Sequence, residues 1–235
     1  IAPGWASSSD LVNAPVPYIF KQPSSATWTA SDLTTTGGAF KYFTKARNSA
    51  GNEVVWGGHA IIDTGIRYTH QDLDGQMWVN SGEIPGNGVD DDGDGYVDNV
   101  HGIDVINNDG DPMDDNSHGT HCAGTIGARA NNGHAHVGVT WQVRLMACKF
   151  LSGDGWGYTS GAIECIDFAV SNGAKVLSNS WGGGGFSQGL YDSIARARDA
   201  GVIFVAAAGN SGLDTDSSPQ YPSAYDLENI IAVAA

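Results

Sequence analysis

The stretch His59-Ala60-Ile61-Ile62-Asp63-Thr64-Gly65 decides the fold of this chain. Its short apolar run is typical of a buried strand, and the run ends on a carboxylate followed by a turn glycine. In sheets of parallel strands, the working residues lie just beyond the carboxyl ends of the strands. Asp63 is therefore a candidate functional residue as well as the end of an element.

Short apolar runs alternate with helical patterns through the rest of the chain. The sequence predicts strands at Val54-Val55, His59 to Ile62, Val143 to Phe150, Lys175 to Ser180, Val202 to Ala208 and Ile230 to Ala234. It predicts helices over His118 to Ala128, around Ala162, Ile166, Ala169 and Val170, and around Leu190, Ile194 and Ala197. This alternation predicts a three-layer α/β fold, with a mostly parallel central sheet covered by helices on both faces.

The chain divides into two parts. Residues 1–52 are rich in Ser, Thr and Pro and show no periodicity, so we interpret them as an N-terminal arm or an unassigned segment. Residues 53–235 carry the strand and helix pattern and form one domain. With 41% apolar and 16% charged residues, a chain of 235 residues can bury a large core. The chain starts without a signal-peptide pattern, so we expect a processed or partial product.

Charge excludes several partners. The net charge is −15, and no Lys or Arg lies between Arg67 and Arg129. Such a field repels nucleic acid and anionic membrane surfaces. No apolar run approaches the roughly 18 residues of a membrane span. The three cysteines, Cys122, Cys148 and Cys165, are too few for a disulfide framework and leave their pairing open.

Asp63 alone is open to several interpretations. A strand-ending Asp before Thr-Gly can simply close a turn or cap a helix. Asp-Thr-Gly also occurs in aspartic proteases, which need two such carboxylates sharing a proton. The chain has no second Asp-Thr-Gly or Asp-Ser-Gly, which disfavours that class.

The segment His118-Gly119-Thr120-His121-Cys122-Ala123-Gly124 opens a helix of small residues. His118 and His121 are spaced to bind a metal from one helix face. The alternative is a helix start in which His121 is buried and hydrogen-bonded, with Asn116 or Ser117 as the cap. Glycines are poor helix formers, so their number here indicates that another backbone or a substrate packs against the helix.

Four motifs in order make the region from Val54 to Ala235 resemble the subtilisin-like serine proteases, or subtilases. They are the strand end at Asp63, the His118 segment, Ser180-Trp181-Gly182-Gly183 and Ala206-Ala207-Ala208-Gly209-Asn210-Ser211-Gly212. Subtilases carry their triad in the order Asp, His, Ser. Cys122 is similar to a cysteine of the proteinase K branch, and residues 83–115 resemble an insert of bacterial and apicomplexan subtilases.

The resemblance implies a role for each matching residue. His118 would be the general base, Asp63 would orient it, and Asn210 would donate its amide to the oxyanion. Two segments would flank an extended peptide, Gly155-Trp156-Gly157 and Ser180-Trp181-Gly182, and Ala207-Ala208-Gly209 would form a wall of the primary pocket. No Gly-Thr-Ser-x-Ala segment occurs in residues 1–235. We therefore expect a domain truncated at its C-terminal end, inactive by itself, whose serine lies beyond residue 235.

The acidic segment predicts a calcium site. Asp90, Asp92 and Asp94, the carbonyl of Tyr96, and Asp98 occupy positions 1, 3, 5, 7 and 9 of an EF-hand-like loop. Position 12 is His101, so the loop is not an EF-hand, and a solvated acidic loop is the alternative. The resemblance implies a second calcium site at Asp72 and Asn132, with a transition-metal site at His134 and His136 as the alternative. We interpret the other acids near the site as solvated surface: Asp104, Asp109, Asp111, Asp114 and Asp115.

Together these observations predict a calcium-stabilised serine endopeptidase that acts on an extended peptide or protein substrate. Its own propeptide is a further candidate partner, and the resemblance implies a monomer that is secreted or held in a secretory-pathway compartment. The alternative is a non-catalytic subtilase relative that binds peptide and calcium. A pure calcium-binding structural module would leave the conjunction of Asp63, His118 and Asn210 without an explanation.

Overall fold

Six parallel strands form the central sheet of this computed structural model, which describes residues 45–47, 53–55, 58–140 and 143–234. The strand order is β4-β5-β3-β6-β7-β8. The strands are β3 (His59–Asp63), β4 (Gly102–Asp104), β5 (Leu145–Lys149), β6 (Val176–Asn179), β7 (Ile203–Ala207) and β8 (Ile230–Val233). Most of the 1–52 segment lies outside the described residues, so its interpretation as an arm stays a prediction.

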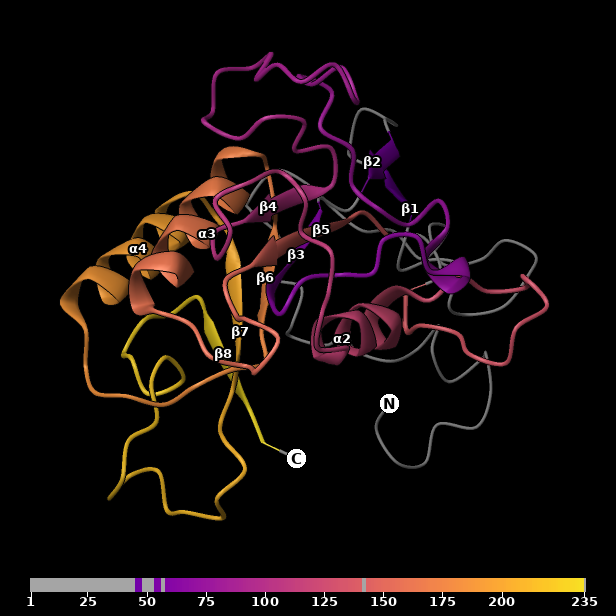
Figure 1. The fold of residues 1–235 in the computed structure, drawn as a ribbon. Coiled ribbons are helices and arrows are strands. Elements are labelled where there is room, and N and C mark those ends of the chain that lie inside the picture. The colour runs from indigo at the N-terminus through magenta and orange to yellow at the C-terminus, as the bar shows by residue number, and fades with distance from the viewer. Residues whose placement is uncertain (1–44, 48–52, 56–57, 141–142, 235) are drawn as a thin grey trace.

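Helices cover both faces of this sheet (Figure 1). They are α2 (His118–Gly127), α3 (Thr159–Ser171) and α4 (Gln188–Asp199), with a short 3-10 helix, η4, at Gln71–Leu73. The helices α3 and α4 pack side by side on one face, and α2 lies on the other. The predicted three-layer α/β architecture is confirmed.

The residues of β3 explain the layering. Ala60 and Ile62 belong to the core beneath α3 and α4, whereas Ile61, which points the opposite way, packs in a second core with Ala123 of α2. Because successive strand residues face opposite sides, a strand buried on both sides must be apolar throughout. This is why the short run before Asp63 carried so strong a signal.

The path of the chain makes the carboxyl end of β3 the point where the strand order reverses. After β3 the chain passes through α2 to β5 on one side, and then through α3 to β6 on the other side of β3. Open parallel sheets bind their ligands where the strand order reverses in this way. Asp63 is the last residue of β3, so it lies at this point.

Three strands differ from the prediction. The Val54-Val55 run forms β2 (Glu53–Val55), which pairs antiparallel with β1 (Lys45–Arg47) in a separate sheet. The strand β4 was not predicted, since it has three residues and pairs only with β5. Gly102 opens β4 with φ +140°, and a Cβ there would lie 1.7 Å from the carbonyl oxygen of Ala147, so only glycine fits.

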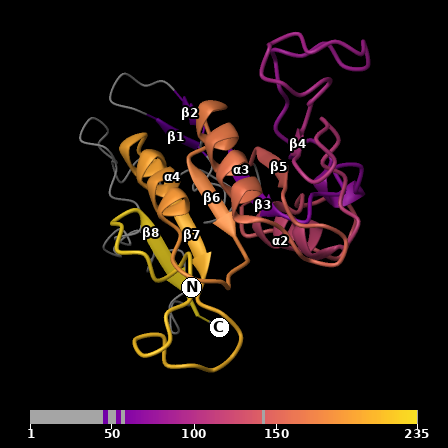
Figure 2. The same cartoon turned by 60° about the vertical axis from the view of Figure 1, so that its left-hand side comes forward.

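The acidic segment 83–98 projects from the body of the molecule in both views (Figures 1 and 2). It lies beyond the end of the sheet opposite to the carboxyl ends of β6 and β7. Among the described residues, no helix is long and apolar enough to cross a membrane.

Candidate active site

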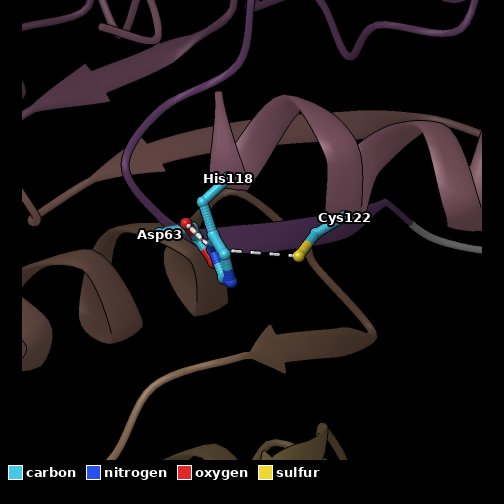
Figure 3. Close-up of side chains that lie close together, drawn as sticks. All are labelled: Asp63, His118 and Cys122. Carbon is cyan, nitrogen blue, oxygen red and sulfur yellow. Dashed lines mark hydrogen bonds and ion pairs between the residues drawn. The ribbon is translucent and has the colours of Figure 1, made fainter. Parts of the chain in front are cut away.

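The side chains of Asp63 and His118 meet where β3 ends and α2 begins. Asp63 Oδ1 lies 2.7 Å from His118 Nδ1. The Asp63 side chain is 1% exposed, whereas that of His118 is 49% exposed. Figure 3 shows the second ring nitrogen of His118 directed away from the carboxylate. A buried carboxylate on Nδ1 holds the imidazole in the tautomer whose Nε2 is free to accept a proton.

Close backbone packing fixes the two elements against each other. The amide of Gly119 donates to Thr64 Oγ1 at 2.9 Å. A Cβ on Gly119 would lie 2.1 Å from the carbonyl oxygen of Gly65, closer than any side chain allows. The glycine content of α2 predicted that another backbone packs against the helix, and the structure shows that this backbone is the turn after Asp63.

Both residues predicted as caps lie at the start of α2, but only one of them accepts a hydrogen bond there through its side chain. Ser117 is the N-cap, with φ +86°, and its side chain makes no capping hydrogen bond. Asn116 Oδ1 instead accepts a hydrogen bond from the amide of His118 at 3.3 Å. His121 is exposed rather than buried, and in the described part of the chain it joins no group of metal-ligating side chains.

Cys122 adds a thiol to the pair. Its Sγ lies 4.0 Å from His118 Nδ1 (Figure 3). It also donates to Ser180 Oγ at 3.6 Å, which links α2 to the end of β6. Burial raises the pKa of the Cys122 thiol, and the negative charges of Asp63 and Asp114 act in the same direction. Ligand atoms of Asp63, His118 and Cys122 lie within 4.8 Å of one another, so this trio could hold a metal ion.

Asn210 lies on the same edge of the sheet. It follows the end of β7 by three residues and is exposed. Ala207-Ala208-Gly209, the predicted wall of the primary pocket, leads from the end of β7 to Asn210. The amide of Ala208 donates to the Val233 carbonyl at 2.8 Å, and the chain turns at Gly209 with φ +102°. The carboxyl ends of parallel strands thus bring Asn210 to the edge that carries Asp63 and Ser180.

The two predicted substrate segments follow the carboxyl ends of β5 and β6. Gly157 touches the strand end, since a Cβ there would lie 2.1 Å from the Phe150 carbonyl oxygen. Gly155 has φ +78°, and the Trp156 side chain between them is 80% exposed. Trp181 packs edge-on against Phe150 with 4.9 Å between ring centroids, which joins the two segments. Gly182 follows Trp181 and is exposed.

Several acids interpreted as solvated surface prove to be structural. Asp104 is 1% exposed and accepts hydrogen bonds from the amides of Ile106 and Asn107. Burial raises the pKa of Asp104. Asp115 pairs with the buried ammonium of Lys149 at 2.6 Å. Asp114 accepts five hydrogen bonds beside His118. Residues 104–115 show no periodic pattern in the sequence, so these contacts could not be foreseen.

In the acidic segment, Asp90 and Asp92 are brought together with Glu83, which the sequence did not single out. Their ligand atoms lie within 4.8 Å of one another. Glu83 is 6% exposed and accepts from the amides of Asp91, Asp92 and Asp98. Its contacts span 8 to 15 residues along the chain, so no local spacing reveals them.

The side chains of Asp94, Tyr96 and Asp98, which supply the other predicted ligands of this loop, make hydrogen bonds of their own. The Asp98 carboxylate accepts from the amides of Gly86, Asn87 and Gly88, and Asp94 accepts from the amide of Tyr96 and the side chain of Asn99. Among the described residues, neither Asp94 nor Asp98 joins the Glu83 group. The ring of Tyr96 is buried, and its hydroxyl donates to Glu164 of α3.

The residues of the second predicted calcium site lie together. Asp72 is 7% exposed, and its Oδ1 accepts from the Asn132 side chain at 2.8 Å. His134 Nδ1 lies 3.2 Å from the side-chain nitrogen of Gln71, and His136 is exposed. In the described part of the chain, neither histidine joins a group of metal-ligating side chains.

Comparison with known proteins shows the family. A profile of the Subtilase family matches residues 60–235, and the chain belongs to this family. It is 41% identical over 188 residues to subtilisin-like protease 1 of Plasmodium vivax, a match that covers 74% of this chain and 30% of that protein. It is 35% identical over 176 residues to thermitase of Thermoactinomyces vulgaris, with 75% and 53% covered. Subtilisin DY of Bacillus licheniformis is 36% identical over 176 residues, with 74% and 54% covered. The chain therefore spans about half or less of these relatives.

Proposed function

We propose that this protein is a serine endopeptidase whose Asp-His-Ser triad takes its first two members from Asp63 and His118. The observation that carries the proposal is the 2.7 Å bond between a buried carboxylate and a half-exposed imidazole at the carboxyl edge of a parallel sheet. The third member is a serine that we do not assign within residues 1–235, which contain no Gly-Thr-Ser-x-Ala segment.

The geometry supports a role for each group in acyl transfer. His118 Nε2 accepts the proton of the serine hydroxyl as the serine oxygen attacks the peptide carbonyl carbon. Asp63 stabilises the imidazolium that forms, and the Asn210 amide donates to the oxyanion. The C–N bond then breaks, and His118 gives its proton to the leaving amine. Water repeats the sequence on the acyl-enzyme, which releases the acid and restores the serine.

The substrate of this proposal is an extended peptide bound between residues 155–157 and residues 180–182. Glycines in both segments allow close backbone approach, and binding through the main chain is largely blind to side chains. Ala207, Ala208 and Gly209 leave room for a sizeable side chain in the primary pocket. The propeptide would occupy the same groove. We further propose a secreted or secretory-pathway monomer, in line with the family.

We propose that calcium stabilises the fold at two places. In the acidic segment Glu83, Asp90 and Asp92 would hold it, and the donor set fits, since it offers only carboxylate oxygens and no Lys or Arg lies between Arg67 and Arg129. The second place is Asp72 with Asn132. Bound calcium would neutralise packed carboxylates that otherwise repel each other.

The test uses the full-length protein with denatured casein as substrate and a serine-directed phosphonate as label. We expect casein cleavage that the phosphonate abolishes, and loss of both cleavage and labelling in His118→Ala. The matched control is His121→Ala, an exposed histidine on the same helix, which should keep its activity. A protein that binds peptide but neither cleaves casein nor reacts with the phosphonate would be the non-catalytic relative. Activity that persists in His118→Ala would also refute the proposal.

A further inference from the structure

The carboxylate of Asp114 lies between the two segments that carry the catalytic pair. Oδ1 accepts hydrogen bonds from Thr64 Oγ1, from the amide of Asn116 and from the amide of Ser117, each at 2.9 Å. Oδ2 accepts from the amide of Thr120 at 2.9 Å and from the Thr120 hydroxyl. One side chain therefore contacts the residue after Asp63 and the residues on both sides of His118.

The hydroxyl groups of Thr64 and Thr120 each accept a hydrogen bond from one segment and donate their own proton to Asp114. The amide of Gly119 in α2 donates to Thr64 Oγ1, so the Thr64 proton is left to donate to Asp114. The amide of Arg67, in the segment after β3, donates to Thr120 Oγ1, whose proton also goes to Asp114. Each chain of hydrogen bonds starts in one segment, crosses to the other and ends on the same carboxylate. Linked hydrogen bonds polarise and strengthen one another.

Asp114 also supports a backbone conformation that is rare for L-residues. Ser117 has φ +86° and directly precedes His118. The amides of Asn116 and Ser117 both donate to Asp114 Oδ1, which holds this turn in place. Without that acceptor the turn is free to relax, and the direction in which His118 leaves the helix start would change.

On the basis of these contacts, and of the function proposed above, we propose that Asp114 is a positioning residue of the catalytic pair. It holds the turn after Asp63 and the start of α2 at the separation at which Asp63 Oδ1 meets His118 Nδ1. Partial burial acts to raise the pKa of Asp114, but the hydrogen bonds from Thr120, Asn116 and Ser117 outweigh it and hold this pKa below its ordinary value. The group is therefore an anion near neutral pH, with every bond donated to it.

The decisive variant is Asp114→Asn in the full-length protein. Asn keeps the size of the side chain, but its NH2 group cannot accept the bonds from Thr120, so one of the two links is lost. The matched control is Asp111→Asn, which removes an exposed carboxylate from the same loop. Within the described part of the chain, this carboxylate accepts one hydrogen bond, from the hydroxyl of Tyr68. We expect kcat to fall on the order of 10- to 100-fold in Asp114→Asn with KM nearly unchanged, because small misplacements cost catalysis rather than uniform binding.

A pH profile separates positioning from a through-space charge effect. If Asp114 positions the pair, kcat falls by a similar factor at every pH, including the pH range in which kcat is constant. The proposal is overturned if kcat is retained, or if its whole loss is a shift of the acidic limb that vanishes at higher pH. Should Asp114→Asn not fold, Thr120→Val and Thr120→Ser replace it. The valine variant, which lacks the hydroxyl, should have a kcat several-fold below that of the serine variant, and equal values would overturn the proposal.

A second readout does not depend on peptidase activity. The proton on His118 Nδ1, bonded to Asp63, gives a low-field proton NMR signal when it is shielded from exchange. We expect this signal in the wild type and in Asp111→Asn, and its shift or loss in folded Asp114→Asn. An unchanged signal would overturn the positioning role even if the protein proved not to be a peptidase, and a lost signal would support it. The failure of the two proposals is thus distinguishable.

Discussion

Replacing Lys149 by Met tests how the carboxyl edge of the sheet is held together. Lys149 ends β5 with a side chain that is 2% exposed. Its ammonium donates to the carbonyl of Thr64 at 3.0 Å, to the carbonyl of Leu151 at 2.8 Å and to Asp115 Oδ1 at 2.6 Å. It therefore joins the turn after Asp63 to the segment that leads to Gly155. Met keeps most of the volume of the stem and removes only the cation.

The expected change in the free energy of unfolding follows from the groups that lose the Lys149 ammonium. Two buried carbonyls lose a charged donor, and an unsatisfied buried acceptor costs about 1–3 kcal/mol. Asp115 is 56% exposed, so water replaces the ammonium there, and the ion pair itself contributes under about 1 kcal/mol. Removing a buried charge also regains part of its desolvation cost. We expect the free energy of unfolding to fall by about 2–3 kcal/mol in Lys149→Met.

The assay is denaturant unfolding of the full-length protein followed by tryptophan fluorescence at neutral pH. The matched control is Lys175→Met, which removes an exposed lysine next to β6 and should change the free energy of unfolding by less than about 0.5 kcal/mol. A Lys149→Met protein as stable as the wild type, or more stable, would refute the reasoning. It would mean that burying this ammonium costs more than its three hydrogen bonds return.

Three further predictions address the site, the acidic segment and the dependence on pH. Gly119→Ala should lower kcat by on the order of 10²-fold, because its Cβ would displace α2 from the turn at Gly65, whereas Gly124→Ala, which meets nothing within 4 Å, should leave kcat within about twofold. A calcium chelator should lower the Tm of the wild type and have a smaller effect on Glu83→Gln, as differential scanning calorimetry would show; equal shifts would contradict a calcium site at Glu83. The lowered pKa of Asp114 stabilises the fold above the unfolded-state value of about 3.9, and this contribution is lost as pH falls through the folded pKa. Denaturant unfolding at several pH values should therefore show a smaller acid-induced loss of stability in Asp114→Asn than in wild type, and identical losses would contradict it.

The strands and helices around the site could be predicted because most of them bury apolar residues against a neighbouring layer. The run Val143 to Phe150 contains β5 (Leu145–Lys149), and Val202 to Ala208 contains β7 (Ile203–Ala207), with ends that differ by one or two residues. All five residues of β5 are buried, and in β7 the buried residues Phe204 and Ala206 alternate with partly buried apolar neighbours, so apolar character persists along both strands and marks them in the sequence. Asp63 could be singled out for the same reason, since a carboxylate ends such a run.

The residues that support the site could not be predicted in this way. Asp114 lies in a loop without periodicity, and its role depends on Thr64, which is 50 residues away in the sequence. Glu83 likewise acts through backbone amides brought to it by the fold. The spacing of nearby residues can predict a strand or a ligand loop. A hydrogen-bond acceptor shared by two distant segments can be recognised only when the positions of both segments in the fold are known.

The acidic segment contacts α3 and lies away from Asp63 and His118. Residues 83–98 lie beyond the end of the sheet opposite to the carboxyl ends of β6 and β7 (Figures 1 and 2), whereas Asp63 and His118 meet at the carboxyl end of β3. The segment is tied to α3 through Tyr96, whose ring packs edge-on against Phe168 and whose hydroxyl donates to Glu164. Burial and this carboxylate raise the pKa of Tyr96, so the bond persists over the whole neutral range. A cation held by Glu83, Asp90 and Asp92 would therefore act on the packing of α3, and through it on the stability of the domain, without touching the bond between Asp63 and His118.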